Sequence, residues 1–180
     1  MLIVLGGLIG NGKVEIANHL ASQKDLHFYD LSRKKLPSMY YDKRGNPTFV
    51  QPQTDAGWIS VYEKVVADFN LLRKMHSNVI LVDSFHRKAP RDFFFEQARS
   101  YFDKISFIWI ETSDDAARRR LSRMWRSGIV YSVEDGTRRL ERARAVAELP
   151  PASVPRFVSK IGDIDAQCVT LWEIVEKSLI

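Results

Sequence analysis

Short apolar runs alternate with longer amphipathic segments along the chain. The runs cover residues 2–5, 26–29, 79–82, 105–110 and, less strongly, 156–161, and their nearly continuous hydrophobicity is typical of parallel strands buried on both faces. Between the runs, apolar positions repeat at helical spacing, which predicts helices over 14–22, 58–75, 91–101, 114–126, 133–147 and 165–179. This alternation predicts an α/β protein with a doubly wound parallel sheet.

Turn-forming residues separate these elements. Ser132 and Asp135 form a capping pattern ahead of one helix, and the prolines of 150–155 predict a stiff connector before the last strand. Glycine, asparagine and prolines between residues 45 and 52 predict an irregular insert of about ten residues. Because 180 residues suffice for one substantial core, we expect a single domain over 1–180.

A glycine-rich turn directly follows the first apolar run. Residues 7–13 read Gly-Leu-Ile-Gly-Asn-Gly-Lys, which matches the pattern G-x-x-x-x-G-K of loops that surround nucleotide phosphates. In such a loop, backbone N–H groups and the N-terminus of the next helix bind phosphate oxygens, and Lys13 adds a mobile positive charge. The alternative is a chance glycine-rich turn. The residues expected to hold the nucleotide are Gly7, Gly10, Asn11, Gly12, Lys13 and Val14.

Val14 departs from the usual form of this motif. Its position normally carries a Ser or Thr, whose hydroxyl binds the Mg²⁺ that bridges the outer phosphates. Without that hydroxyl, Mg²⁺ has to be held by waters and carboxylates, or turnover is low or absent. The loop therefore predicts nucleotide binding more directly than catalysis.

Polar residues follow two predicted strands at their carboxyl ends, the edge where open α/β sheets bind ligands. Asp30 can accept or orient the proton of an attacking hydroxyl, and Arg33 can bind a phosphate of the acceptor. Asp83 can orient the acceptor or, through water, Mg²⁺, and Arg87 on the same rim is a candidate substrate contact. The alternatives are helix caps for the carboxylates and solvated positions for the arginines.

The region expected to bind the acceptor, about residues 31–57, has little pattern of its own. Tyr40, Tyr41, Phe49 and the adjoining Trp58 can stack on a nucleotide base, or they can fill the core. The sequence leaves these two readings open.

Arginines concentrate in the helix over 114–126. In a helical projection the apolar residues share one face and three arginines share the other: Ala117, Leu121, Met124 and Trp125 against Arg119, Arg123 and Arg126. A bound phosphate would relieve repulsion among these charges, so we expect a lid over about 119–142 in which Arg123 and Arg126 neutralise a transferring phosphoryl group. The alternative is a solvated basic face with local acidic partners.

Composition adds further constraints. The formal net charge of +5 and pI near 9.4 favour an anionic partner such as nucleotide phosphates or a nucleic-acid end, although soluble surfaces often carry such an excess. No stretch approaches the roughly 20 apolar residues that a membrane-spanning helix requires. Cys168, the single cysteine, is expected to be a buried small hydrophobe. We therefore expect a soluble cytoplasmic protein without a membrane partner.

Together, the loop ending in Lys13, Asp30 with Arg33, Asp83 and the arginines of 119–126 resemble the P-loop nucleoside and nucleotide kinase superfamily. The layout is most similar to the kinase domains of polynucleotide 5′-hydroxyl kinases and related small P-loop kinases, over nearly the whole chain. The resemblance implies a three-layer P-loop NTPase sandwich, with a five-stranded parallel sheet of order 2-3-1-4-5.

The same resemblance implies ATP- and Mg²⁺-dependent transfer of the γ-phosphoryl group to a nucleoside, a nucleotide or a polynucleotide end. Lys13, Asp30, Arg123 and Arg126 are then the expected catalytic residues. Two alternatives stay open. The chain is a nucleotide-binding module with weak or no catalysis, or it is a kinase for a small hydroxyl-bearing or anionic metabolite.

Overall fold

The computed structural model describes residues 1–31, 39–41, 47–49, 52, 54–126 and 132–179; at residues 30, 39–41, 47–49, 125 and 126 it describes the backbone alone. Within these residues, five parallel strands form one sheet of order β2-β5-β1-β6-β7. Counted along the chain, this is the order 2-3-1-4-5, so the predicted α/β class and strand order are confirmed.

The strands and helices lie where the hydrophobic pattern predicts them, with ends that shift by up to three residues. The sheet strands are β1 (Leu2–Gly6), β2 (His27–Asp30), β5 (Val79–Val82), β6 (Ile105–Glu111) and β7 (Arg156–Val158). The helices are α1 (Lys13–Lys24), α3 (Asp55–Met75), α4 (Lys88–Ala98), α5 (Asp114–Arg126), α6 (Val133–Ala145) and α7 (Ile164–Ser178).

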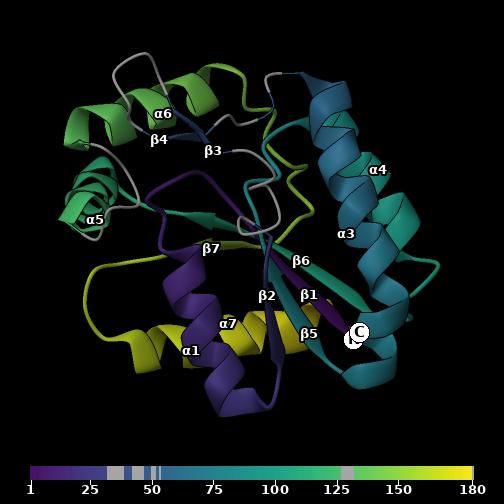
Figure 1. Ribbon diagram of the computed structural model, residues 1–180. Helices are drawn as coiled ribbons and strands as arrows, with labels where there is room; N and C mark the ends of the chain where they lie inside the picture. Colours follow the sequence, from purple (N-terminus) through teal and green to yellow (C-terminus); the bar gives the residue numbers. More distant parts are fainter. Residues whose placement is uncertain (32–38, 42–46, 50–51, 53, 127–131, 180) are drawn as a thin grey trace.

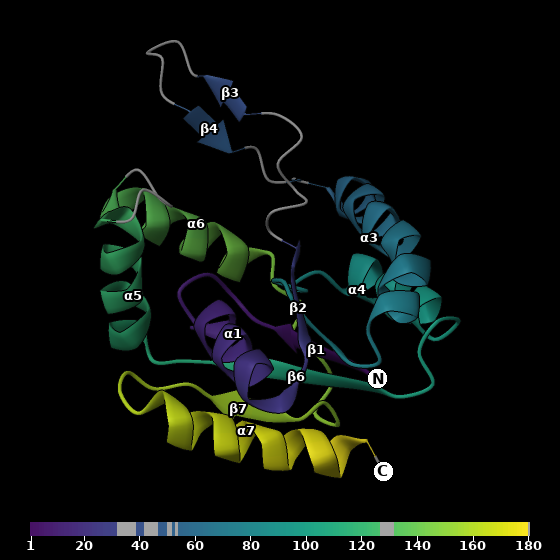
Figure 2. The ribbon, with the colours of Figure 1, turned by 60° about the horizontal axis from the view of Figure 1, so that its bottom comes forward.

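Helices cover both faces of the sheet. Figures 1 and 2 show α1 and α7 on one face, α3 and α4 on the other, and the pair α5 and α6 beside the end of the sheet where the loop after β1 lies. This arrangement is the expected three-layer sandwich. Among the described residues, no helix combines the length and the hydrophobicity needed to cross a membrane.

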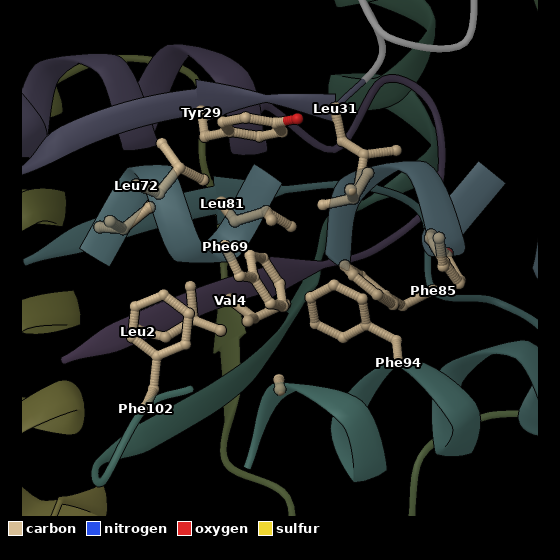
Figure 3. Packing of buried hydrophobic residues seen from close by; sticks show 14 of the residues in the cluster. Leu2, Val4, Tyr29, Leu31, Phe69, Leu72, Leu81, Phe85, Phe94 and Phe102 are labelled. Atoms are coloured by element: carbon tan, nitrogen blue, oxygen red, sulfur yellow. The ribbon is translucent and has the colours of Figure 1, made fainter. Parts of the chain in front are cut away.

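The alternation of side chains along β1 divides the core into two halves. Leu2 and Val4 face an aromatic-rich cluster with α3 and α4 that includes Phe69 and Phe94 (Figure 3). Ile3 and its neighbours of the same parity pack against α1 and α7, where Cys168 is buried as predicted. Because both faces are covered, β1 is fully apolar, and its carboxyl end is held rigidly between the two layers.

Helix α4 begins three residues earlier than its apolar pattern suggests. Pro90 occupies its first turn, where a residue without an N–H is tolerated because no helical acceptor faces that position. The helix ends at Ala98, where the N–H of Tyr101 bonds to the Ala98 carbonyl in a tighter turn. The predicted span of 91–101 was therefore displaced toward the C-terminus.

The expectation of an irregular insert between residues 45 and 52 is wrong in part. Strands β3 (Met39–Tyr41) and β4 (Pro47–Phe49) pair as an antiparallel two-stranded sheet, separate from the main sheet in Figure 2. Their tyrosine, threonine and phenylalanine residues favour extended structure. The proline and glycine content was therefore a misleading guide to this segment.

Candidate functional site

The glycine-rich loop lies between the carboxyl end of β1 and the first turn of α1. Gly12 precedes α1 with φ of 81°, a left-handed conformation that favours glycine, and Lys13 is the first helical residue. The N–H of Gly7 bonds to the Ser84 carbonyl at 3.0 Å, which ties the start of the loop to the segment after β5. The loop thus presents the N-terminus of α1 at the edge of the sheet.

The side chain of Asn11 connects the loop to the end of β6. Its side chain is 3% exposed, and Nδ2 donates to the carbonyl of Ile110, at the end of β6, at 2.7 Å. Its Oδ1 accepts from the backbone N–H of Lys13 at 3.3 Å and from Nζ of Lys13 at 3.4 Å. The Asn11 side chain therefore supports the loop from the end of β6.

Lys13 folds back over its own loop, because Nζ also donates to the Leu8 carbonyl at 3.1 Å. The next residue, Val14, is 43% exposed in the first turn of α1. Its side chain ends in methyl groups, so the position that normally supplies a metal-binding hydroxyl offers no oxygen here.

Arg120 braces the loop from the side. It lies in α5 and is only 8% exposed. Its Nη1 donates to the Gly10 carbonyl at 3.4 Å, to Thr112 Oγ1 at 3.1 Å and to Ser159 Oγ at 3.1 Å, while Nη2 donates to the Lys160 carbonyl at 2.6 Å. Arg120 therefore joins the glycine-rich loop, the turn between β6 and α5, and the segment after β7.

A hollow of about 210 Å³ opens beside this brace. Glu15, Arg120, Arg123 and the segment from Lys160 to Gly162 line it, together with residues at the start of α7. Burial lowers the pKa of the Arg120 guanidinium, and the charge of Glu15 partly offsets that effect. The hollow lies beside the loop and is lined by one carboxylate, Glu15, and by the basic side chains of Arg120, Arg123 and Lys160. This lining is suited to a polar ligand.

Asp83 lies directly beside the glycine-rich loop, as its place after β5 predicts. Its backbone N–H bonds to the Leu5 carbonyl at 3.2 Å, and its side chain is 4% exposed. One carboxylate oxygen, Oδ2, accepts a hydrogen bond from the Tyr62 hydroxyl at 2.9 Å. The carboxylate is therefore held in a fixed orientation next to the phosphate-binding edge.

Arg87, a predicted substrate contact, forms an ion pair with Asp55 at the start of α3, with Nη1 and Oδ1 2.7 Å apart. Arg91, farther along the same rim, is buried and donates to the carbonyls of Phe85 and Glu148 at 2.9 and 2.7 Å. Both arginines thus stabilise the segment that carries Asp83.

The acceptor side is described only in part. The backbone of Asp30 ends β2 and pairs with Val82, so it lies at the carboxyl edge of the sheet. The side chain of Asp30, the side chain of Arg126 and the whole of Arg33 lie outside the described residues. Trp58, which the sequence left open between base stacking and packing, is 2% exposed and belongs to the core.

The two-faced pattern of α5 is confirmed for the residues whose side chains are described. Ala117 and Leu121 are buried against Leu140 of α6, with Met124 beside them. On the outer face Arg119 pairs with Asp115 at 3.0 Å, and Arg123 is exposed. The structure therefore brings Arg123 to the hollow and leaves Arg119 in a local surface ion pair.

The side chains around the loop fit one way of holding Mg²⁺. The described residues contain no group of three or more His, Cys, Asp or Glu side chains that forms a metal cage. Mg²⁺ bound through nucleotide phosphates keeps several waters and needs only one or two carboxylates. Asp83 lies beside the loop and offers one such carboxylate, so the donor set around the loop fits nucleotide-bound Mg²⁺.

Sequence reasoning overlooked Arg120 and Tyr62. Arg120 follows Ala117 by three residues and precedes Met124 by four, so it borders the buried stripe of its helix, and that spacing was the available signal. Tyr62 is part of the apolar repeat of α3, in which nothing distinguishes its hydroxyl from a core ring.

A larger hollow, of about 390 Å³, lies at the opposite end of the sheet. His27 and His76 line it with their rings stacked 3.8 Å apart. Burial lowers the pKa of His27, and the neighbouring His76 lowers it further. This hollow is remote from the glycine-rich loop, because it surrounds the amino-terminal ends of β2 and β5, and it takes no part in the candidate site.

A parallel sheet of this strand order, with a glycine-rich loop between β1 and α1, is the arrangement of a P-loop NTPase α/β fold. Solved structures share it over nearly their full lengths. A sugar kinase from Janibacter sp. aligns with a TM-score of 0.70 at 16% identity, over 97% of this chain and 94% of that chain. A gluconokinase from Sinorhizobium meliloti aligns with a TM-score of 0.67 at 17% identity, over 98% and 92%.

Kti12 from Chaetomium thermophilum, in complex with ADP-AlF3, aligns with a TM-score of 0.64 at 16% identity, over 100% of both chains. At these identities the likeness shows a shared fold. No protein-family model matches the sequence, and a search of curated proteins gives no significant match.

Proposed function

We propose that the protein is a phosphotransferase that moves the γ-phosphoryl group of ATP, with Mg²⁺, to a hydroxyl or phosphate group of an acceptor. The observation that carries this proposal is the braced loop of residues 7–13 at the N-terminus of α1, with Lys13 above it. The fold shared with small kinases supports it.

In this proposal the loop N–H groups and Lys13 bind the outer phosphates of the nucleotide. Nζ of Lys13 exchanges its contact with the Leu8 carbonyl for phosphate oxygens. The nucleoside part lies in the hollow beside Arg120 and Lys160. Mg²⁺ bound with the nucleotide would neutralise charge on the outer phosphates, and Asp83, directly after β5, would help to hold it through water.

In this proposal the acceptor binds over about residues 31–57, the part of the chain that follows β2. Its hydroxyl oxygen forms a bond to the γ-phosphorus, the bond from that phosphorus to the bridging oxygen breaks, and ADP leaves. Asp30 accepts the hydroxyl proton, and Arg33 and Arg87 bind an anionic part of the acceptor. Arg123 and Arg126, in a lid over 119–142, stabilise the transferring group.

The names of two neighbours in fold add a class of acceptor to those expected from the sequence. These names, a sugar kinase and a gluconokinase, point to hydroxyl groups of sugars and sugar acids. Small hydroxyl-bearing metabolites therefore join nucleosides, nucleotides and 5′-hydroxyl polynucleotide ends as acceptors to be compared.

The test is an ADP-release assay with ATP and Mg²⁺ against a panel of sugars, sugar acids, nucleosides, nucleotides and 5′-hydroxyl oligonucleotides. Lys13→Ala is expected to lower turnover and ADP affinity by at least about tenfold, the effect of losing a charge-assisted contact. Lys177→Ala, at an exposed position in the last turn of α7, is the matched control and is expected to change neither. Absence of turnover with every acceptor refutes the proposal.

Val14 favours a second candidate, a nucleotide-binding module without catalysis. It predicts that Mg²⁺ leaves ATP affinity unchanged and that Val14→Thr creates turnover that the wild type lacks. Turnover by the wild-type protein rules this candidate out.

A further inference from the structure

A buried hydrogen bond connects Asp83 of the candidate site to helix α3, which covers one face of the sheet. The hydroxyl of Tyr62, on α3, donates to Oδ2 of Asp83 at 2.9 Å, and the two side chains are 1% and 4% exposed. A hydroxyl in an apolar cluster is costly unless it is hydrogen-bonded. The Asp83 carboxylate satisfies it, so the polar atom of Tyr62 is directed at the site.

The ring of Tyr62 is fixed by its neighbours. It stacks on Phe85 with centroids 5.1 Å apart and meets Phe94 edge-on at 5.4 Å; Figure 3 shows Phe85 and Phe94 side by side in this cluster. Burial, reinforced by the charge of Asp83, raises the pKa of the Tyr62 hydroxyl well above its ordinary value. Tyr62 is therefore an uncharged donor with a fixed position.

The backbone on the other side of this bond is also fixed. Phe85 has φ of 46°, a conformation that is strained for a residue with a side chain. Arg91 holds it by donating to its carbonyl at 2.9 Å, and the Ser84 carbonyl accepts from Gly7 of the phosphate loop. Asp83 is therefore held both through its own backbone neighbours and through its carboxylate.

The bond between Tyr62 and Asp83 matters for metal binding because Val14 stands where the loop usually has a metal-binding hydroxyl. Because it lacks the usual hydroxyl, the protein's contribution to holding nucleotide-bound Mg²⁺ has to come from carboxylates. We propose that Tyr62 is a positioning residue that fixes Asp83 for this task, so that a tyrosine on α3 compensates for the altered loop. The inference rests on the proposed function, and it concerns how the residues of this chain would hold nucleotide-bound Mg²⁺.

The experiment measures ADP affinity by calorimetry, with and without Mg²⁺, so it needs no acceptor. Tyr62→Phe keeps the ring and removes the hydroxyl. We expect the Mg²⁺-dependent gain in ADP affinity to fall by about tenfold or more, the usual scale for a hydrogen bond to a charged group, while metal-free ADP affinity stays unchanged. A merely structural role for Tyr62 would alter the two affinities together.

Tyr29→Phe is the matched control. The Tyr29 hydroxyl donates to Asp68 Oδ2 at 2.8 Å, which is the same kind of bond at a different place on α3. It is expected to leave the Mg²⁺-dependent gain intact. In an Asp83→Asn background, Tyr62→Phe is expected to cause no further loss, because the two residues act through one contact.

Retention of the full Mg²⁺-dependent gain by Tyr62→Phe overturns the inference, as does the absence of such a gain in the wild type. Additive losses in the double variant overturn it as well, because Tyr62 would then act independently of Asp83. None of these results excludes phosphoryl transfer to an acceptor. The proposed function fails only if the acceptor panel shows no turnover, so the two failures can be distinguished.

Discussion

Replacing Arg120 by methionine tests whether the brace beside the glycine-rich loop holds the nucleotide site together. Methionine keeps much of the buried chain volume and removes the guanidinium. The acceptors that lose their donor are the carbonyls of Gly10 and Lys160 and the hydroxyls of Thr112 and Ser159. Three separate segments of the chain therefore lose their common connection.

The size of the effect follows from these contacts. A hydrogen bond from a charged donor contributes about 1.5–3 kcal/mol, but these bonds share one guanidinium, and burying its charge offsets part of their sum. We expect a net loss of about 2–4 kcal/mol in the free energy of unfolding. For a protein of this length, that loss corresponds to a fall in Tm of about 5–15 °C.

ADP affinity is expected to fall at the same time by about tenfold or more, because Arg120 both braces the Gly10 carbonyl and lines the hollow beside the loop. The assays are thermal unfolding and ADP titration. Arg119→Met is the control: this neighbour pairs with Asp115 on the surface, and exposed pairs of this spacing contribute about 0.3–0.5 kcal/mol.

The proposed role of Arg120 is refuted if Arg120→Met resembles Arg119→Met in both assays. A fall in Tm with unchanged ADP affinity would show that the brace stabilises the fold without shaping the nucleotide site.

Two further predictions concern the loop and the contact between α1 and α7. Gly7→Ala is expected to destabilise the protein by about 3 kcal/mol or more in urea unfolding, because the added Cβ would lie 1.8 Å from Asn11 Nδ2. The control is Gly162→Ala, which is also at positive φ but has no atom near the added Cβ, so its loss of stability should be clearly smaller. Equal losses in the two variants would contradict the predicted clash. Hydrogen bonds with His19 and Gln23 lower the pKa of Asp165. The ionised Asp165 therefore stabilises the folded protein above the unfolded pKa of about 3.9, and this stabilisation is lost as pH falls through the lower pKa of the folded protein. The stability difference between wild type and Asp165→Asn should therefore shrink below about pH 4, and a difference that is constant from pH 6 to pH 3 would contradict this.

The sequence predicted those parts of the site that depend on chain order. Lys13 and Asp83 follow buried strands, and parallel strands bring their carboxyl ends to one edge, so their neighbourhood could be inferred before any contact was known. The order of the sheet came from the resemblance to small P-loop kinases. The apolar face of α5 followed from its periodicity alone.

Contacts between distant residues could not be predicted in this way. The bond from Tyr62 to Asp83 and the ion pair of Arg87 with Asp55 depend on how α3 is set against the sheet, and periodicity specifies a buried face without its angle or depth. The contacts of Arg120 could not be predicted either. A charged residue at the border of an apolar stripe can face water or a buried set of hydrogen-bond acceptors, and which of these it faces depends on the carbonyl groups that the fold places opposite it.

The loop is held from three directions before any ligand arrives. Asn11 bonds to the end of β6, Gly7 to the Ser84 carbonyl, and Arg120 joins Gly10 to the segment after β7. Binding to such a preorganised loop is expected to cost little conformational entropy, and the backbone N–H groups that would bind phosphate do not involve the side chain of Val14. In the usual motif the hydroxyl at this position binds the metal, so under the proposed function Val14 is expected to separate nucleotide binding from the Mg²⁺-dependent step, and Asp83 is expected to determine how much of that step is retained.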